Sequence, residues 1–72
     1  MTAEITVFEL SQEYIELIKL LKLLNLVESG SEAKWVVEEG MVLCNEEVEY
    51  RKRKKLRTGD IVEFADQKIQ IK

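Results

Sequence analysis

One short segment of the chain holds most of the side chains that could act chemically. Six of the seven residues from 51 to 57, here called the basic run, are cationic: Arg51, Lys52, Arg53, Lys54, Lys55 and Arg57. An arginine can hold a phosphate with two parallel hydrogen bonds, whereas a lysine acts as a point charge. So many neighbouring like charges repel one another, which indicates a partner that supplies negative charge. A polyphosphate backbone is the commonest partner of this kind.

Charge is divided unevenly along this chain of 72 residues, whose formal net charge is -3. Residues 1–50 contain three lysines and eleven glutamates, whereas residues 51–72 contain eight Lys or Arg and three Asp or Glu, which gives -8 and +5. Such asymmetry favours a nucleic-acid-binding function. The alternative is that the basic run is a solvated edge strand, which its charges protect from aggregation.

The composition argues against catalysis and against a bound metal. The chain has no histidine and one cysteine, Cys44, so zinc clusters and histidine-based acid–base catalysis lack their usual groups. Cys44 lies in an apolar stretch and is expected to be a small buried residue. We therefore predict a non-catalytic protein with no catalytic residues, no cofactor and no metal site.

The sequence lacks the patterns of exported and membrane proteins. The first residues do not show the basic segment, apolar stretch and cleavage motif of a signal peptide. The longest apolar-rich stretch, residues 14–27, contains charged side chains and is too short to span a bilayer. A lone cysteine also fits a reducing compartment. The expectation is a cytoplasmic protein with no membrane contact.

The first half of the chain predicts a strand and two helices. Residues 4–8 are β-prone, and an apolar stripe then predicts an amphipathic helix that Ser11 caps and that ends near Asn25. The stripe consists of Tyr14, Leu17, Ile18, Leu20, Leu21 and Leu24. Residues 29–32 form a capping box for a second helix, which Gly40 ends. The inward face of this helix is expected to contain Ala33, Val36 and Val37.

The middle of the chain predicts strands that lead into the basic run. Residues 41–44 read as an apolar strand, and Asn45-Glu46 as a tight turn. The next four residues alternate, which predicts that Val48 and Tyr50 face the core. If the chain stays extended beyond them, the side chains that face water are those of Arg51, Arg53 and Lys55.

The end of the chain predicts a turn and a hairpin. Residues 58–60 form the turn, and residues 61–64 and 68–71 are the strands of a hairpin around residues 65–67. Residues 1–72 are expected to form a single α+β domain. In it, two helices make a helix-turn-helix-like corner that packs on one side of a small, mostly antiparallel sheet.

The order of these elements and of residues within them resembles a known family. From Leu17 to Phe64, the chain is similar to the alpha-L RNA-binding motif, the domain named after the fourth protein of the small ribosomal subunit. The residues that carry the resemblance are Leu17, Leu21, Ser29, Ala33, Lys34, Gly40, Met41, Val42, Asn45, Leu56, Gly59 and Asp60. Residues 29–34 and 51–53 most resemble the free-standing bacterial members, the YbcJ-like and YaaA-like proteins.

The resemblance implies non-catalytic binding of structured RNA, either ribosomal RNA, transfer RNA or a ribosomal particle. Contacts would read the phosphate backbone and the shape of the RNA more than base identity. Many family members have arginine where this chain has Glu16 and Gly30, which moves the expected contact area towards Lys34 and the basic run. The expected RNA-binding residues are Ser29, Gly30, Ser31, Lys34, Arg51, Lys52, Arg53, Lys54, Lys55 and Arg57.

The start of the second helix has two interpretations. The backbone N–H groups of Gly30 and Ser31, with Lys34 nearby, could seat a phosphate. Alternatively, the capping box already satisfies those donors, and Lys34 pairs with Glu38 one turn later. The family resemblance favours the RNA contact.

Trp35 projects away from the inward face of the second helix. It could stack on an unpaired base, but such a tryptophan more often packs beneath a neighbouring loop or contacts a protein. The rival function is therefore a protein-interaction module. In it, the basic run docks on an acidic partner protein and Trp35 anchors that contact or a homodimer. Double-stranded DNA is disfavoured because Glu32, Glu38 and Glu39 would repel its phosphates.

Overall fold

Two short helices and seven short strands form the described part of the chain, residues 4–72, in a computed structural model of the protein. In chain order they are β1 (Glu4–Phe8), β2 (Ile15–Glu16), α1 (Leu17–Leu23), α2 (Gly30–Glu38), β3 (Leu43–Cys44), β4 (Glu47–Val48), β5 (Lys55–Leu56), β6 (Ile61–Phe64) and β7 (Gln67–Ile71). Five strands pair in the order β1-β7-β6-β3-β4, and β2 and β5 form a separate pair. β1 and β7 are parallel and the other pairs are antiparallel, so the expected α+β fold is confirmed.

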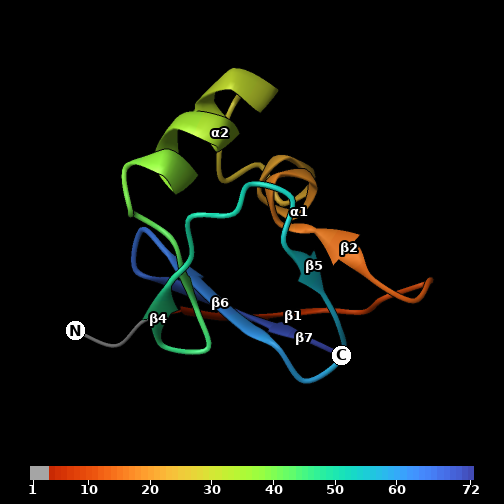
Figure 1. The fold of residues 1–72 in the computed structure, drawn as a ribbon. Helices are drawn as coiled ribbons and strands as arrows, with labels where there is room; N and C mark the ends of the chain where they lie inside the picture. Colours follow the sequence, from red (N-terminus) through yellow and green to blue (C-terminus); the bar gives the residue numbers. More distant parts are fainter. Residues whose placement is uncertain (1–3) are drawn as a thin grey trace.

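Both helices lie on one face of the five-stranded sheet (Figure 1). The side chains that β6 and β7 bury on this face are Val62, Phe64, Ile69 and Ile71. The helices contribute Leu17, Leu20, Leu21, Ala33, Val36 and Val37 to the same core. Helices of seven and nine residues are too short to be stable alone, so this burial is what holds them. The predicted inward face of α2 is confirmed, and of the stripe predicted for the first helix, Leu17, Leu20 and Leu21 are buried, whereas Tyr14 lies before α1.

The first helix begins later than the sequence predicted. Ser11 lies in a bend, and Glu16 occupies the N-cap position without a side-chain cap. Ile15 and Glu16 instead pair as β2 with Leu56 and Lys55 of β5. The partner strand lies about 40 residues later in the chain. Its backbone provides hydrogen-bond partners that a helix would otherwise have to provide, so this pairing overrides the local helical pattern.

Val48 and Tyr50 do not face the core, so this prediction was wrong. Val48 is 43% exposed and Tyr50 63% exposed. The residues of the Asn45-Glu46 turn both have positive φ (52° and 70°), as a two-residue type I′ hairpin requires. This turn pairs Val48 with Leu43, which lies on the opposite face of the strand from the buried Cys44. The side chains alternate as predicted, but the pairing register that the turn sets places Val48 and Tyr50 on the exposed face.

Other predicted ends and turns are confirmed. Asn25, just after α1, has a φ of 58°, and Gly40, just after α2, has a φ of 75°. Both are therefore in the left-handed conformation that stops a helix. Ala65 and Asp66 also have positive φ and form the two-residue turn of the β6–β7 hairpin.

Replacing Leu21 by Ala should lower the free energy of unfolding by about 2–5 kcal/mol, because it empties a fully buried position. Leu23→Ala is the matched control, since Leu23 lies on the same helix but is 58% exposed. It should change stability by less than about 0.5 kcal/mol. Urea unfolding followed by circular dichroism compares the two variants. Equal losses would contradict the assignment of the α1 core face.

Candidate nucleic-acid interface

The basic run is a turn followed by a short strand, and not the continuous extended segment that the sequence suggested. Lys52 and Arg53 form the turn, and the backbone N–H of Lys54 donates to the carbonyl of Arg51 (3.2 Å). Only Lys55 continues as a strand, in β5. A straight cationic row at strand spacing is therefore not present. The cations are gathered around a turn instead.

The first turn of α1 holds the basic run in place. The N–H groups of Leu17 and Ile18 donate to the carbonyls of Lys54 (2.9 Å) and Lys52 (3.2 Å). These N–H groups have no partner within the helix, because they belong to its first turn. The basic run therefore caps the helix with its backbone, and its carbonyl oxygens point inward. Its charged side chains are left at the surface.

Five cationic side chains of the basic run line one shallow hollow of about 450 Å³: Arg51, Arg53, Lys54, Lys55 and Arg57. Arg51, Arg53 and Lys55 are exposed, as the sequence predicted, and Lys52 and Lys54 are half-buried. The hollow has no carboxylate in its lining. The lining of this hollow is therefore positively charged.

Four of the six cations also form ion pairs with glutamates. These pairs are Arg51–Glu49 (2.9 Å), Lys52–Glu38 (2.6 Å), Arg53–Glu16 (3.2 Å) and Arg57–Glu13 (3.3 Å). Pairs between exposed side chains contribute about 0–1 kcal/mol each, so a phosphate can displace such a carboxylate at little cost. Lys54 and Lys55 form no ion pair with any side chain in residues 4–72.

The Arg51–Glu49 pair differs from the other three. The Glu49 carboxylate accepts from the Arg51 backbone N–H (3.0 Å), from Nε (2.9 Å) and from an NH2 group (3.3 Å). These hydrogen bonds from Arg51 lower the pKa of Glu49 below its ordinary value. Glu49 is therefore a fixed support that orients the Arg51 guanidinium at the start of the basic run.

Tyr14 supports the other end of the basic run, and the sequence reasoning missed this role. Lys55 Nζ lies 5.0 Å from the centre of its ring, and Arg57 Cζ lies 5.7 Å from it. Both distances are within the range of a cation–π interaction. Tyr14 had been assigned to the apolar stripe of a helix that begins later than predicted. Two adjacent β-prone residues, Tyr14 and Ile15, were the local sign that the helix starts later.

The end of the basic run is fixed by two residues that carried the family resemblance. The Asp60 carboxylate accepts from the Arg57 backbone N–H (2.9 Å) and from Asn45 Nδ2 (3.1 Å). Asn45 Oδ1 in turn accepts from the Ile61 N–H (3.0 Å). Asn45 and Asp60 thus connect two turns and fix the path of the chain between the basic run and β6.

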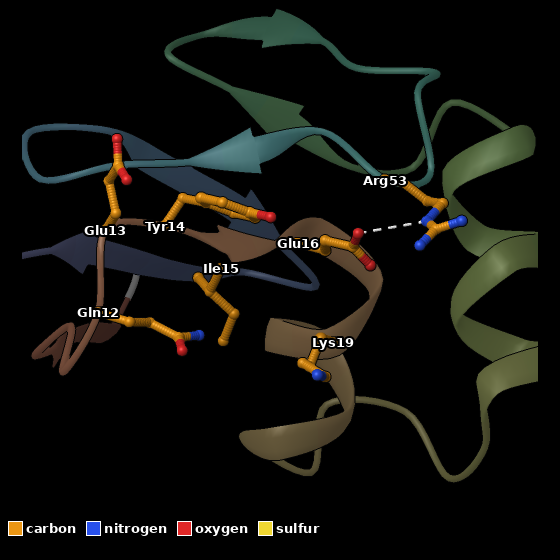
Figure 2. A pocket seen from close by; sticks show the side chains of 7 residues that line it. All are labelled: Gln12, Glu13, Tyr14, Ile15, Glu16, Lys19 and Arg53. Atoms are coloured by element: carbon orange, nitrogen blue, oxygen red, sulfur yellow. Dashed lines mark hydrogen bonds and ion pairs between the residues drawn. The ribbon is translucent and has the colours of Figure 1, made fainter.

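A second hollow, of about 440 Å³, lies beside the basic run (Figure 2). Figure 2 shows the Glu16 carboxylate, at the end of β2, turned towards the Arg53 guanidinium. Glu13, Lys19 and Tyr14 are also part of its lining. Because carboxylates and cations alternate here, this hollow is less suited to an anion than the one lined by cations.

The start of α2 is capped much as predicted. The Ser29 side-chain oxygen accepts from the Glu32 N–H (3.1 Å). The Glu32 carboxylate, however, accepts from the N–H of Glu28 (2.6 Å), one residue earlier than the capping box predicted. Gly30 is half-buried, and Ser29 and Ser31 are exposed, so the expected contact residues at this end are accessible to different degrees.

Lys34 is exposed on α2 and does not pair with Glu38, contrary to the alternative interpretation. Glu38 pairs with Lys52 instead. Gly30, Lys34 and Glu38 recur at every fourth residue and share one side of α2. Because Glu38 contacts the basic run, this side faces it. The two predicted parts of the interface therefore lie on the same side of the molecule.

The remaining residues with distinctive chemistry lie elsewhere. Trp35 is 54% exposed, so it is not packed beneath a loop of the chain. Cys44 is buried, and burial raises the pKa of its thiol. Within residues 4–72, no group of three or more His, Cys, Asp or Glu side chains could hold a metal ion. None of the helices described is both long and apolar enough to cross a membrane.

The chain is similar to known bacterial proteins. Residues 8–72 match the family described as the S4 domain. The chain is 43% identical over 58 residues to "Putative RNA-binding protein YbcJ" of Escherichia coli (strain K12), and the match covers 81% of this chain and 83% of that protein. It is 44% identical over 52 residues to "Probable ribosome maturation protein RlbA" of Bacillus subtilis (strain 168), with 72% and 73% covered.

A solved structure has the same fold. The solution structure of YbcJ from Escherichia coli matches with a TM-score of 0.70 and 38% identity, and the match covers 99% of this chain and 91% of that one. That structure is described as revealing an alfaL motif involved in RNA-binding. The resemblance to the alpha-L motif is therefore confirmed.

Glu49→Gln should lower the free energy of unfolding at neutral pH. A carboxylate whose pKa falls on folding stabilises the folded state above its ordinary pKa, near 4.5. This stabilisation is lost as the pH falls through the lowered pKa, so the difference between wild type and variant should shrink below about pH 4. Urea unfolding at a series of pH values measures it. Glu47→Gln, an exposed position on β4, is the control, and a difference independent of pH would contradict the role of Glu49.

Proposed function

The chain belongs to the S4 domain family, and from this membership we propose that it binds structured RNA without catalysing a reaction. The basic run and the start of α2 contact the phosphate backbone, and the RNA is selected by its folded shape more than by its bases. The RNA is ribosomal or transfer RNA. The name of the Bacillus subtilis relative, a ribosome maturation protein, favours ribosomal RNA or a ribosomal particle.

The hollow lined by five cations is the observation that carries this proposal. It lies on a chain whose net charge is -3, so the positive surface is local and is surrounded by negative charge. Such an arrangement attracts a polyanion to one place and repels it elsewhere, which orients the RNA before contact. It also matches the words used for both YbcJ comparisons, which refer to RNA binding.

Binding proceeds by exchange of anions at the basic run. Lys54 and Lys55 are available for phosphates directly, because no ion pair within residues 4–72 engages them. Arg53 exchanges the half-buried Glu16, and Arg57 the exposed Glu13, for a phosphate, which offers arginine a bidentate contact. Release of counterions from the RNA adds a favourable term that weakens as salt rises.

The rival function, docking of the basic run and Trp35 on an acidic protein, rests on the exposure of Trp35. If this rival function is correct, the protein should bind RNA weakly or without a steep dependence on salt. The salt dependence of RNA binding therefore separates the two functions.

Affinity for an RNA hairpin should fall steeply with salt, with a slope of log affinity against log salt of roughly -0.7 to -0.9 for each phosphate contacted. The double variant Lys54→Gln/Lys55→Gln should weaken binding and make this slope shallower by about one to two. Lys68→Gln/Lys72→Gln is the matched control, because it removes the same charge from β7 and the residue after it. Fluorescence anisotropy across a salt series measures both. A flat response, or equal losses in the two double variants, would refute the proposed interface.

Glu16→Gln should raise RNA affinity about three-fold at low salt. The change removes a negative charge next to Arg53. In water, the repulsion between this charge and a phosphate about 6 Å away is roughly 0.7 kcal/mol. The matched control is Glu63→Gln on β6, which should leave affinity unchanged. The same anisotropy assay compares the two variants. Unchanged or weaker binding by the Glu16 variant would show that Glu16 does not compete with phosphate for Arg53.

A further inference from the structure

An exposed aromatic ring stands at the entrance to the basic run. Tyr50 immediately precedes Arg51 and is 63% exposed, although the sequence pattern predicted that it faces the core. Large aromatic rings normally pack in the core or take part in recognition. Because Tyr50 lies beside the first cation of the basic run, its ring can contact the same ligand.

The Tyr50 ring is held in place by a glycine. A Cβ atom at Gly40 would lie 3.2 Å from the Tyr50 hydroxyl oxygen and 3.4 Å from Cε1 of the ring. The ring edge therefore rests on the backbone at the end of α2, where a side chain would crowd it. Val48 Cγ1 approaches the same place at 3.5 Å. The ring loses little further freedom when something stacks on it, since these contacts already restrict it.

The backbone on both sides of Tyr50 is also fixed. The N–H of Glu49 donates to the carbonyl of Val42 (3.0 Å). The N–H of Arg51 donates to the Glu49 carboxylate (3.0 Å). Tyr50 therefore lies between two anchored residues, so that its ring and the Arg51 side chain have a defined relation to each other.

Arg51 keeps donors for a ligand despite its pair with Glu49. A guanidinium has five N–H donors, and the hydrogen bonds to Glu49 use those of Nε and one of NH2. The remaining N–H groups are accessible, because the side chain is 71% exposed. Glu49 thus orients the guanidinium and leaves part of it free to hold a phosphate oxygen.

We propose that Tyr50 stacks on one unpaired base of the bound RNA while Arg51 holds the adjoining phosphate. The inference rests on the proposed function and specifies its ligand, an RNA with an unpaired nucleotide in a loop or bulge. Tyr50 and Arg51 are neighbours in the chain, with Cα atoms about 3.8 Å apart, and both side chains are exposed, so that one nucleotide can contact both. Stacking on an aromatic ring tolerates any base, since each has a π face.

Trp35 is less suited to this role even though it is exposed. Its neighbours on the outer side of α2, one turn away in each direction, are Glu32 and Glu39, and both are exposed. These carboxylates would repel the phosphate of a base that stacked on Trp35. Tyr50, in contrast, is followed directly by the basic run, so its surroundings favour a nucleotide.

The test compares two RNAs with equal numbers of phosphates, a continuous duplex and a duplex with one bulged nucleotide. Tyr50→Ala should weaken binding of the bulged RNA roughly five-fold to a hundred-fold. It should leave the affinity for the duplex and the salt slope unchanged. Tyr50→Phe keeps the ring and should bind as the wild type does. Trp35→Ala is the matched control, because it removes another aromatic ring that is more than half exposed, and it should have no effect.

A fluorescent base in the bulge reports stacking directly. With 2-aminopurine at the unpaired position, the wild type and Tyr50→Phe should quench its emission, and Tyr50→Ala should not. If Tyr50→Ala binds and quenches the bulged RNA as the wild type does, the stacking role is wrong, while salt-dependent binding of both RNAs still supports the proposed function. If the wild type binds neither RNA, both proposals fail. Sedimentation tests whether the ring serves self-association instead. A dimer that dissociates only in Tyr50→Ala, with RNA affinity unchanged, would overturn the stacking role.

Discussion

The first turn of α1 and the carbonyl groups of the basic run depend on each other. A helix begins with N–H groups that need acceptors, and here the acceptors are the carbonyls of Lys52 and Lys54. The β2–β5 pair continues the same contact along the chain. Without it, α1 would lose its cap, and the densest cluster of positive charge would have no fixed position. The fold thus uses the backbone of the basic run for stability and leaves its side chains at the surface.

Charge compensation explains how the molecule tolerates this cluster before it meets a partner. Four glutamates, residues 13, 16, 38 and 49, each pair with one cation. Three of these pairs are at least partly exposed to solvent and therefore weak, and they reduce repulsion without closing the surface. The fourth, Arg51–Glu49, is reinforced by a backbone hydrogen bond and orients the turn. In the proposed RNA complex, phosphates replace the first three carboxylates, while Glu49 stays as a support.

The sequence predicted those features that depend on local chemistry. The apolar faces of the helices, the Ser29 cap, the left-handed Asn25 and the Asn45-Glu46 turn all follow from neighbouring residues. The order of the elements in turn supported the family resemblance. The errors have two causes, which are contacts between distant segments and the pairing register of a local hairpin. Two-residue strands such as β2 carry too little pattern to compete with a helical stripe, so the start of α1 was placed too early. The phase of Val48 and Tyr50 depended on the pairing register, and the ion pairs of Arg53 and Arg57 join residues 37 and 44 positions apart. Sequence periodicity contains no signal for either.

Backbone amide spectra of the ¹⁵N-labelled protein, recorded while an RNA hairpin is added, test the central claim most directly. If RNA binds at the basic run, the largest shifts should fall on residues 50–57 and 29–34. The amides of Leu17 and Ile18 should shift with them, because they donate to the carbonyls of the basic run. Ile5 and Val7, on the far face of the sheet, should not change. Shifts centred on β1 and β7, with the basic run and the start of α1 unaffected, would contradict the interface.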